Sequence, residues 1–248
     1  MSFRACIVVP VYNHGPGACT LAARLEPLGL RTILVNDGSH ADCAEMLRQL
    51  SATHDWIEIV EHERNRGKGG AVLSGLRTAR TQGFTHALQI DADGQHDTGD
   101  IPRFLSLASE NPGAVVTGRP VFDASAPKGR QLARYLTHVW VWIETLSFTI
   151  RDSMCGFRVY PLEPVLQLAD RTKLGQRMDF DPEVLVRLFW MGIPVVSLPT
   201  AVSYPKDGVS HFRILHDNLL ITRMHVRLVF GMLWRAPLLL YRRALLRA

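Results

Sequence analysis

The sequence lacks any run of about 18 uncharged apolar residues, which argues against a transmembrane helix. The N-terminal stretch MSFRACIVVPVYN becomes apolar at once, without the long apolar region and cleavage site of a signal peptide. No two of the four cysteines have C-x-x-C spacing, so we expect reduced thiols packed among apolar residues. Internal repeats and low-complexity tracts are missing as well. These absences favour a cytoplasmic globular protein.

Acidic residues are scarce at the C-terminal end. Residues 212–248 carry seven arginines, no lysine and one acid, Asp217, a net charge of +6. Because the whole chain carries +5, the remaining residues sum to −1. The basic charge therefore belongs to a tail, and this argues against nucleic acid as a partner.

Within this tail, apolar-leaning positions recur at steps of four and three, which predicts a helix. They are Leu215, Leu219, Thr222, Val226, Val229 and Leu233, and arginines 223, 227 and 235 lie off that stripe. Pro237 is expected to break the helix before a second apolar and basic stretch. The pattern suits an anionic membrane surface. A helix packed on the core with a solvated arginine face fits it too.

The first half of the chain alternates strand and helix patterns. Runs rich in Val, Ile and Leu predict strands at 5–10, 31–37, 56–62, 85–91 and 114–118, with helices at 18–29, 40–51, 67–82 and 98–109. Later residues predict a helix at about 130–150, strands at 155–161 and 193–199, and a helix at 181–192. The alternation indicates an α/β fold with a mainly parallel sheet flanked by helices. We expect one domain, 1–211, followed by the helical segment 212–248.

Two of the predicted helices carry local start signals. Ser39 and Asp42 have the spacing of a capping box. Asp181 and Pro182 are expected as the N-cap and first residue of the helix at 181–192, and Gly192 as the residue that follows it.

Polar clusters follow three of the predicted strands: PVYN the first, NDGS the second and DADGQH the fourth. Each cluster alone is compatible with an ordinary turn. In open α/β sheets, however, ligands bind beyond the carboxyl ends of the strands. Three polar strand ends at one edge therefore predict one site.

The third cluster carries alternating oxygen ligands. In extended backbone, Asp91, Asp93 and Gln95 would project the same way. Hard oxygen ligands at this spacing suit Mg²⁺ or Mn²⁺, which would take further oxygens from a substrate diphosphate. His96 is either another ligand or a neighbouring histidine, and Asp97 is expected to begin the next helix.

The segment NRGKGGAVLSGL at 65–76 is a glycine-rich loop leading into a helix. Its backbone N–H groups could bind phosphate at the helix N-terminus, with Lys68 as the positive group beside the anion. It matches neither G-x-x-x-x-G-K-[ST] nor G-x-G-x-x-G.

Seven motifs occur in the order and spacing of glycosyltransferase family 2: VVPVYN, NDGS, NRGKGGAVLSGL, DADGQH, VTGR, DSMCGFRVYP and MDFDPEVLVRLFWMGIPVVSLP. Over about residues 3–213 the chain resembles this family, and most nearly its dolichol- or polyprenyl-phosphate mannosyl- and glucosyltransferases. The resemblance implies a GT-A fold and an inverting, Mg²⁺- or Mn²⁺-dependent transfer of a sugar from a UDP- or GDP-linked donor to a lipid-linked acceptor.

The resemblance also assigns roles to residues. It implies donor binding by Pro10, Tyr12, Asn13, Asp37, Lys68, Asp91, Ala92 and Arg119, and metal binding by Asp91, Asp93 and Gln95. It implies phosphate or acceptor binding by Arg130, Arg134, Lys206 and Ser210. Two departures bear on the acceptor: the usual GxSK reads GVSH at 208–211, and the transmembrane helices of many members of the branch are missing.

The catalytic residues depend on the acceptor. A hydroxyl acceptor needs a carboxylate to take its proton, whereas a phosphate acceptor is already ionised. Asp179 and Asp181 are the candidate bases, beside Asp93 as a catalytic metal ligand. The competing interpretations are that Asp181 is a helix N-cap and that Asp179 is a surface residue.

The leading prediction is a glycosyltransferase bound peripherally at the cytoplasmic face of the inner membrane, acting on a lipid-linked acceptor. An alternative is the same transfer to a soluble or carrier-bound acceptor in lipid, polysaccharide or pigment synthesis. A nucleotidyltransferase is a third possibility, although PVYNHGPG matches its glycine-rich signature poorly. A non-catalytic nucleotide- or membrane-binding module is the alternative of another class.

Overall fold

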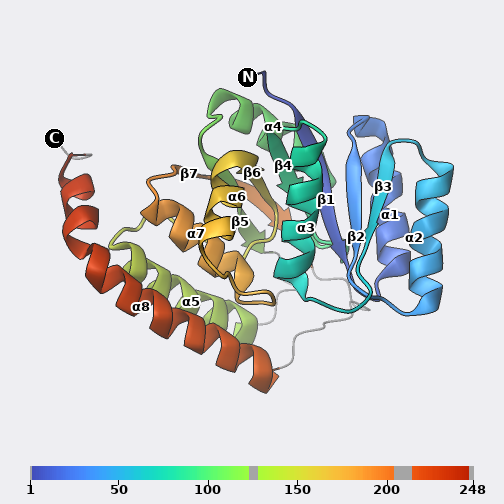
Figure 1. Cartoon of the computed structure of the whole chain (residues 1–248). Coiled ribbons are helices and arrows are strands. Elements are labelled where there is room, and N and C mark those ends of the chain that lie inside the picture. Colours follow the sequence, from blue (N-terminus) through green and yellow to red (C-terminus); the bar gives the residue numbers. More distant parts are fainter. Residues whose placement is uncertain (1, 123–127, 204–213, 246–248) are drawn as a thin grey trace.

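A computed structural model describes residues 2–122, 128–203 and 214–245 (Figure 1). In this part of the chain one sheet has the strand order β3-β2-β1-β4-β6-β5-β7. Strand β6 is antiparallel to both of its neighbours, and all the other pairs are parallel. The strands are β1 (Ala5–Val11), β2 (Thr32–Asn36), β3 (Ile57–Glu61), β4 (His86–Gln89), β5 (Val115–Phe122), β6 (Arg158–Pro161) and β7 (Val195–Val202). The predicted mainly parallel sheet is confirmed.

Helices connect and cover these strands on both faces (Figure 1). They are α1 (Gly15–Leu25), α2 (Ala41–Thr53), α3 (Lys68–Thr81), α4 (Ile101–Glu110), α5 (Lys128–Thr145), α6 (Leu162–Arg171), α7 (Phe180–Trp190) and α8 (Ile214–Leu245). Short 3-10 turns, Glu26–Leu28 and Thr98–Asp100, follow α1 and precede α4.

Strand β1, which lies inside the sheet between β2 and β4, contributes side chains to two hydrophobic layers. Cys6 and Val8 pack with buried residues of α3, α6 and α7, whereas Ile7 and Val9 pack with those of α1, α2 and α4. All four side chains are fully buried. A strand covered on both faces must be apolar at every position, which explains the continuous run CIVV. The sheet is thereby held rigidly, and the loops at its carboxyl edge start from fixed points.

Helix α8 packs along α5 and α7, and Figure 1 shows it beside α5. It continues through Pro237, so the predicted break is wrong. Pro237 lies on the exposed side, where water can bond the carbonyl that loses its N–H donor. The buried side consists of Asp217, Ile221, Met224, His225, Leu228, Met232 and Leu239.

The stripe expected to form the apolar face of this helix is mostly exposed instead. Leu215, Leu219, Val226 and Leu233 are 51–89% exposed. The helix therefore carries apolar residues on two sides, and only one of them packs against the protein. Among the described helices, none combines the length and hydropathy that crossing a membrane requires.

The predicted capping signals have mixed outcomes. The N-cap of α2 is His40, and the hydroxyl of Ser39 accepts a hydrogen bond from the Asn13 N–H instead (2.9 Å), so the capping box is wrong. Asp97 does cap the turn before α4, accepting from the Gly99 N–H at 2.9 Å. Gly192 follows α7 with a φ of 86°, as expected, whereas Asp181 lies inside α7.

Candidate active site

The loops after β1 and β2 are bonded to each other at the carboxyl edge of the sheet. The Asp37 N–H donates to the Val11 carbonyl (2.8 Å), and the His40 N–H donates to the Asn13 side chain (2.8 Å). Pro10 and Tyr12, at the end of β1, are half-buried beside this connection. The predicted common edge of PVYN and NDGS is therefore confirmed.

Asp37 fixes the loop that leads into α3. Its carboxylate accepts hydrogen bonds from the Arg66 and Gly67 N–H groups at 2.8 and 2.7 Å. The Nδ1 of His62 lies 2.7 Å from the same carboxylate, and Asp37 is only 2% exposed. Both carboxylate oxygens thus accept hydrogen bonds within the chain, so Asp37 holds the loop beside the site in place.

The N-terminus of α3 is closed by the loop before α7. The Gly69 and Gly70 N–H groups donate to the Gln176 carbonyl at 2.9 and 3.3 Å. Gly67 has a φ of 88°, and a side chain there would meet that carbonyl at 2.4 Å, so only glycine fits. The Gly69 and Gly70 amides are therefore already bonded within the chain, which argues against phosphate binding by these two groups.

Lys68 bridges two aspartates from distant parts of the chain. Its ammonium nitrogen lies 2.7 Å from Asp91 Oδ2 and 2.8 Å from Asp181 Oδ2. Burial alone would lower the lysine pKa, but the charges of Asp181 and Asp91 raise it above its usual range. For Asp181, burial acts to raise the pKa, and the charges of Lys68 and Arg158 outweigh it and lower the pKa. Asp181 is therefore an ion-pair partner, and its predicted role as a helix N-cap is wrong.

The segment from Asp91 to Gly94 forms a turn after β4, not an extended strand. The Gln95 N–H donates to Asp93 Oδ1 at 3.0 Å, which closes the turn. The predicted alternation of three side chains is therefore wrong, although the turn still brings both acids to the site. Burial, followed by the negative charge of Asp91, raises the pKa of Asp93 to about 6.

These two acids fit a divalent cation. Asp91 Oδ1 is buried and has no hydrogen-bond partner in the described part of the chain, while its other oxygen is held by Lys68. The pKa of Asp93 is raised by burial and by the charge of Asp91, and a bound cation would offset both effects. No cluster of three His, Cys, Asp or Glu ligands occurs among the described residues. Such an ion would thus complete its shell with the Gln95 amide, water or substrate oxygens, as Mg²⁺ commonly does.

His96 packs next to this turn. Its ring lies 5.2 Å from the Phe157 ring, and burial lowers its pKa to about 4. Its Nδ1 atom is buried without a partner in the described structure. A neutral imidazole therefore lies beside the turn that carries Asp91 and Asp93. This agrees both with His96 as a metal ligand and with His96 as a neighbouring histidine.

Two residues that the sequence patterns did not single out support the ion-pair cluster. Gly156 passes so close that an added side chain would lie 2.6 Å from both Asp91 Oδ2 and Lys68 Nζ. Arg158, fully buried in β6, donates to the backbone carbonyls of Asp181 (2.8 Å) and Ser153 (2.7 Å). The signal for Arg158 was present in the sequence: an arginine inside the apolar run GFRVYP.

The predicted phosphate-binding arginines differ in availability. Arg134 forms a two-point ion pair with buried Asp152 at 2.5 and 2.7 Å, and His138 Nε2 lies 3.2 Å from the same carboxylate. Burial acts to raise the pKa of Asp152, but hydrogen bonds from His138 and Arg134 take it well below its usual range. Much of the charge of Arg134 is therefore compensated within the protein.

Arg119 is exposed on β5, and its guanidinium has no ion-pair partner among the described residues. Arg130 lies on α5, but its side chain falls outside the described residues, as Lys206 and Ser210 do entirely. Ala92 is buried within the turn between the two acids.

The second candidate base is also engaged. Asp179 is 6% exposed, and its Oδ1 accepts a hydrogen bond from the Arg177 N–H at 3.1 Å. The interpretation of Asp179 as a surface residue is therefore wrong. Asp179 and Asp181 are both buried at the start of α7.

Comparison with known proteins agrees with this geometry. The family model "Glycosyl transferase family 2" matches residues 6–171, which is more than half of the chain. The chain belongs to this family. It is therefore a glycosyltransferase, and Asp91 and Asp93 lie in the region that the family model covers, whereas Asp181 lies beyond it.

Curated relatives of this glycosyltransferase include enzymes named for lipid acceptors. It is 30% identical over 226 residues to a dolichyl-phosphate beta-glucosyltransferase of Trichomonas vaginalis, covering 84% of this chain but 65% of that relative. It is 23% identical over 213 residues to the polyprenol monophosphomannose synthase of Mycolicibacterium smegmatis, covering 84% and 80% of the two chains. These names agree with the dolichol- and polyprenyl-phosphate branch.

Solved structures share the GT-A fold. Glucosyl-3-phosphoglycerate synthase of Mycobacterium tuberculosis, in complex with phosphoglyceric acid, aligns with a TM-score of 0.67 at 14% identity, covering 93% of this chain and 80% of that one. A mannosyltransferase of Pyrobaculum calidifontis, in complex with GDP-Man and Mn²⁺, aligns with a TM-score of 0.60 at 16% identity, covering 95% and 65%. At these identities the likeness concerns the fold alone.

Proposed function

We propose that this glycosyltransferase transfers a sugar, with inversion and with a divalent metal, from a UDP- or GDP-linked donor to a polyprenyl-phosphate-like acceptor at the cytoplasmic face of a membrane. The observation that carries the proposal is the arrangement of Asp91, Asp93 and Lys68 at the carboxyl edge of the sheet. The names of the lipid-phosphate relatives support the acceptor class.

Lys68 has a positioning role in this proposal. By bonding Oδ2 of Asp91, it leaves Oδ1, which has no hydrogen-bond partner among the described residues, available to a cation. Asp93 and Gln95, on the same turn, would be the further ligands. Bound there, Mg²⁺ or Mn²⁺ would stabilise the negative charge that develops on the nucleoside diphosphate as the glycosidic bond breaks.

The donor would lie along the edge formed by Pro10, Tyr12, Asn13 and Ala92. Asp37 would act there by holding the Arg66–Gly67 backbone in place. Exposed Arg119 would offset phosphate charge directly, whereas Arg134 would act mainly through Asp152. Arg130, Lys206 and Ser210 stay predictions for the acceptor phosphate.

The state of the two candidate bases supports a phosphate acceptor. Asp181 is paired with Lys68 and its pKa is lowered, so it is a weak base. Asp179 is buried and bonded to backbone. A phosphate is already ionised and can attack the anomeric carbon opposite the leaving group without either base, which inverts that carbon.

An exposed apolar surface on α8 supports contact with a membrane. Phe230 and Trp234 are 64% and 89% exposed, in addition to the exposed Leu215, Leu219, Val226 and Leu233. The arginines contribute less than the sequence suggested: Arg227 pairs with Glu183 at 3.2 Å, and Arg242 donates to the Trp190 carbonyl at 2.9 Å. Insertion of apolar side chains would therefore provide most of the affinity for the membrane. Residues 1–211 would form the catalytic domain.

Vesicle flotation tests the membrane part. The Phe230→Asp/Trp234→Asp variant is expected to lose binding to vesicles of phosphatidylcholine and phosphatidylglycerol, because two exposed apolar anchors are replaced by charges. Met46→Asp is the matched control, since Met46 is an exposed apolar residue on α2. Equal flotation of both variants and the wild type would contradict the proposal.

A thermal-shift panel tests the donor and the metal. UDP, GDP and their glucose and mannose conjugates are each added with EDTA or with Mn²⁺. We expect one nucleotide series to stabilise the wild type only with Mn²⁺, and Asp93→Ala to remove that shift. If no nucleotide stabilises the chain, a non-catalytic module is favoured.

A soluble anionic acceptor is the second candidate. The glucosyl-3-phosphoglycerate synthase of Mycobacterium tuberculosis, in complex with Mn²⁺, UDP-glucose and phosphoglyceric acid, aligns over 93% of this chain with a TM-score of 0.66. Such an acceptor is also ionised, so it satisfies the same argument about the base. Transfer to phosphoglyceric acid but not to polyprenyl phosphate would favour it.

A further inference from the structure

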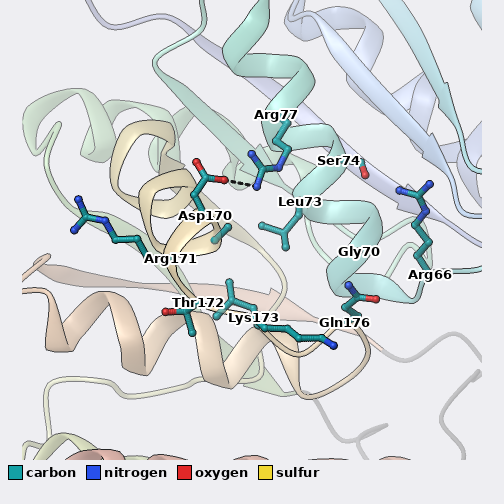
Figure 2. A pocket seen from close by; sticks show the side chains of 12 residues that line it. Arg66, Gly70, Leu73, Ser74, Arg77, Asp170, Arg171, Thr172, Lys173 and Gln176 are labelled. Carbon is teal, nitrogen blue, oxygen red and sulfur yellow. Dashed lines mark hydrogen bonds and ion pairs between the residues drawn. The ribbon is translucent and has the colours of Figure 1, made fainter.

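We propose that a basic pocket between α3 and α6 binds a small molecule bearing a phosphate or diphosphate group. This pocket is separate from the strand-end site, by which we mean the candidate active site around Asp91 and Asp93 at the carboxyl edge of the sheet. Figure 2 shows this pocket, whose volume is about 550 Å³. That volume lies within the range of about 300–1,000 Å³ typical of small-molecule sites. The proposal rests on this geometry alone and does not depend on the transfer reaction.

The pocket has an excess of positive charge. Arg66, in the loop before α3, and Lys173, in the loop after α6, line the pocket, and neither side chain has an ion-pair partner among the described residues. Arg77 also lines it, but reaches across to Asp170 at 2.6 Å, so these two charges offset each other. Arg171 extends away from the pocket in Figure 2 and is not counted. Two uncompensated cations therefore remain.

Uncharged donors complete a lining suited to phosphate. Ser74, Thr172 and Gln176 also line the pocket, together with the apolar residues Leu73 and Leu174. Charge-assisted hydrogen bonds from lysine and arginine to phosphate oxygens are among the stronger polar contacts in proteins. A bare metal cation is disfavoured there, because Asp170, the one carboxylate among the described residues that line the pocket, is already paired.

A hydrogen-bonded chain leads from the pocket to the strand-end site. The Ser74 hydroxyl lies 2.9 Å from His62 Nε2, and His62 Nδ1 lies 2.7 Å from the Asp37 carboxylate. Because a carboxylate only accepts, His62 donates from Nδ1 to Asp37, and in the tautomer with its only proton on Nδ1 the Nε2 atom accepts from the Ser74 hydroxyl. An anion that accepts the hydrogen bond of the Ser74 hydroxyl would therefore remove that bond from His62 Nε2. His62 also bonds Asp37, which holds the loop before α3.

Calorimetry of the full chain with inorganic pyrophosphate tests the pocket. EDTA is present throughout, so that metal-dependent binding at Asp91 and Asp93 does not contribute. We expect the wild type to bind, and the Arg66→Ala/Lys173→Ala variant to bind at least about tenfold more weakly, as the loss of charge-assisted hydrogen bonds implies. The control Arg223→Ala removes an exposed arginine on α8 and should stay within about twofold of wild type.

The outcomes separate the pocket from general charge attraction. No metal-independent binding by the wild type, or equal binding by the double variant, overturns the proposal. An equal loss in Arg223→Ala also overturns it, because it would show attraction to the whole basic surface.

The imidazole resonances of His62 test the connection to the strand-end site. In histidine-labelled protein, pyrophosphate should shift the His62 signals of the wild type. In Ser74→Ala, pyrophosphate should still bind but leave those signals in place. Binding by the wild type without any His62 shift would overturn the connection.

Discussion

Replacing Lys68 by methionine removes the charge that joins Asp91 to Asp181 and keeps an unbranched side chain only one atom shorter. The lysine and Asp181 side chains are 17% and 6% exposed, so the variant leaves a buried carboxylate without its ion-pair partner. Removing one partner of a buried ion pair typically costs about 3–5 kcal/mol. Protonation of Asp181 limits the cost, because protonating an ordinary aspartate at pH 7 requires about 4 kcal/mol. We therefore expect a loss of about 3 kcal/mol in the free energy of unfolding.

For a chain of this size, each kcal/mol shifts the melting temperature by about 2–4 °C, so Lys68→Met should melt roughly 6–12 °C below wild type in EDTA at pH 7. Arg77→Met is the matched control, because the Arg77–Asp170 pair is about as short (2.6 Å) but its side chains are 50% and 60% exposed. Exposed pairs contribute at most about 1 kcal/mol.

The pH dependence has a definite sign. The folded pKa of Asp181 is lowered, so its contribution is present at neutral pH and is lost as the pH falls through the acidic range. The difference between wild type and Lys68→Met should therefore narrow on acidification. Equal melting temperatures for Lys68→Met and Arg77→Met at pH 7 would refute the reasoning.

Two further variants test the supports of the site. Asp152→Asn should destabilise the chain by about 3 kcal/mol at pH 7, since Arg134 and His138 lose a buried anion. Because the folded pKa of Asp152 is lowered, denaturant titrations should show this difference shrinking below about pH 4. Gly156→Ala should lower the rate of sugar transfer at least about tenfold, because its methyl group would displace the lysine–aspartate ion pair. Gly113→Ala, with nothing within 4 Å of the added carbon, should leave the rate unchanged.

Much of the fold followed from local patterns. Strand–helix alternation predicted the parallel sheet, and the rule that ligands bind at carboxyl strand ends brought PVYN, NDGS and DADGQH to one edge. Both inferences need only periodicity and turn chemistry. The family resemblance added the GT-A fold, which the solved structures support.

The errors arose where tertiary contacts override local signals. Asp181 precedes Pro182 and has the local pattern of a helix N-cap. Its carboxylate instead forms an ion pair with Lys68, which is far away in the sequence but adjacent in the fold. Ser39 matched a capping box, yet its hydroxyl bonds the loop after β1. Nothing in the local sequence reveals such partners.

Helix α8 shows a limit of periodicity itself. Apolar residues repeat at helical spacing on two sides, and the stripe singled out from the sequence is the exposed one. Ile221, Met224 and Leu228 pack inward because they face α5 and α7, whose positions the sequence of α8 does not encode.

Direct transfer to a lipid acceptor is the decisive measurement. The full chain is incubated with Mn²⁺, vesicles containing polyprenyl phosphate, and radiolabelled UDP-glucose or GDP-mannose, and the label in the extracted lipid is counted. We predict labelled lipid from one of the two donors, dependent on Mn²⁺ and abolished in an Asp93→Ala variant that melts as wild type does. No labelled lipid from either donor, or wild-type rates in Asp93→Ala, would contradict the proposed function.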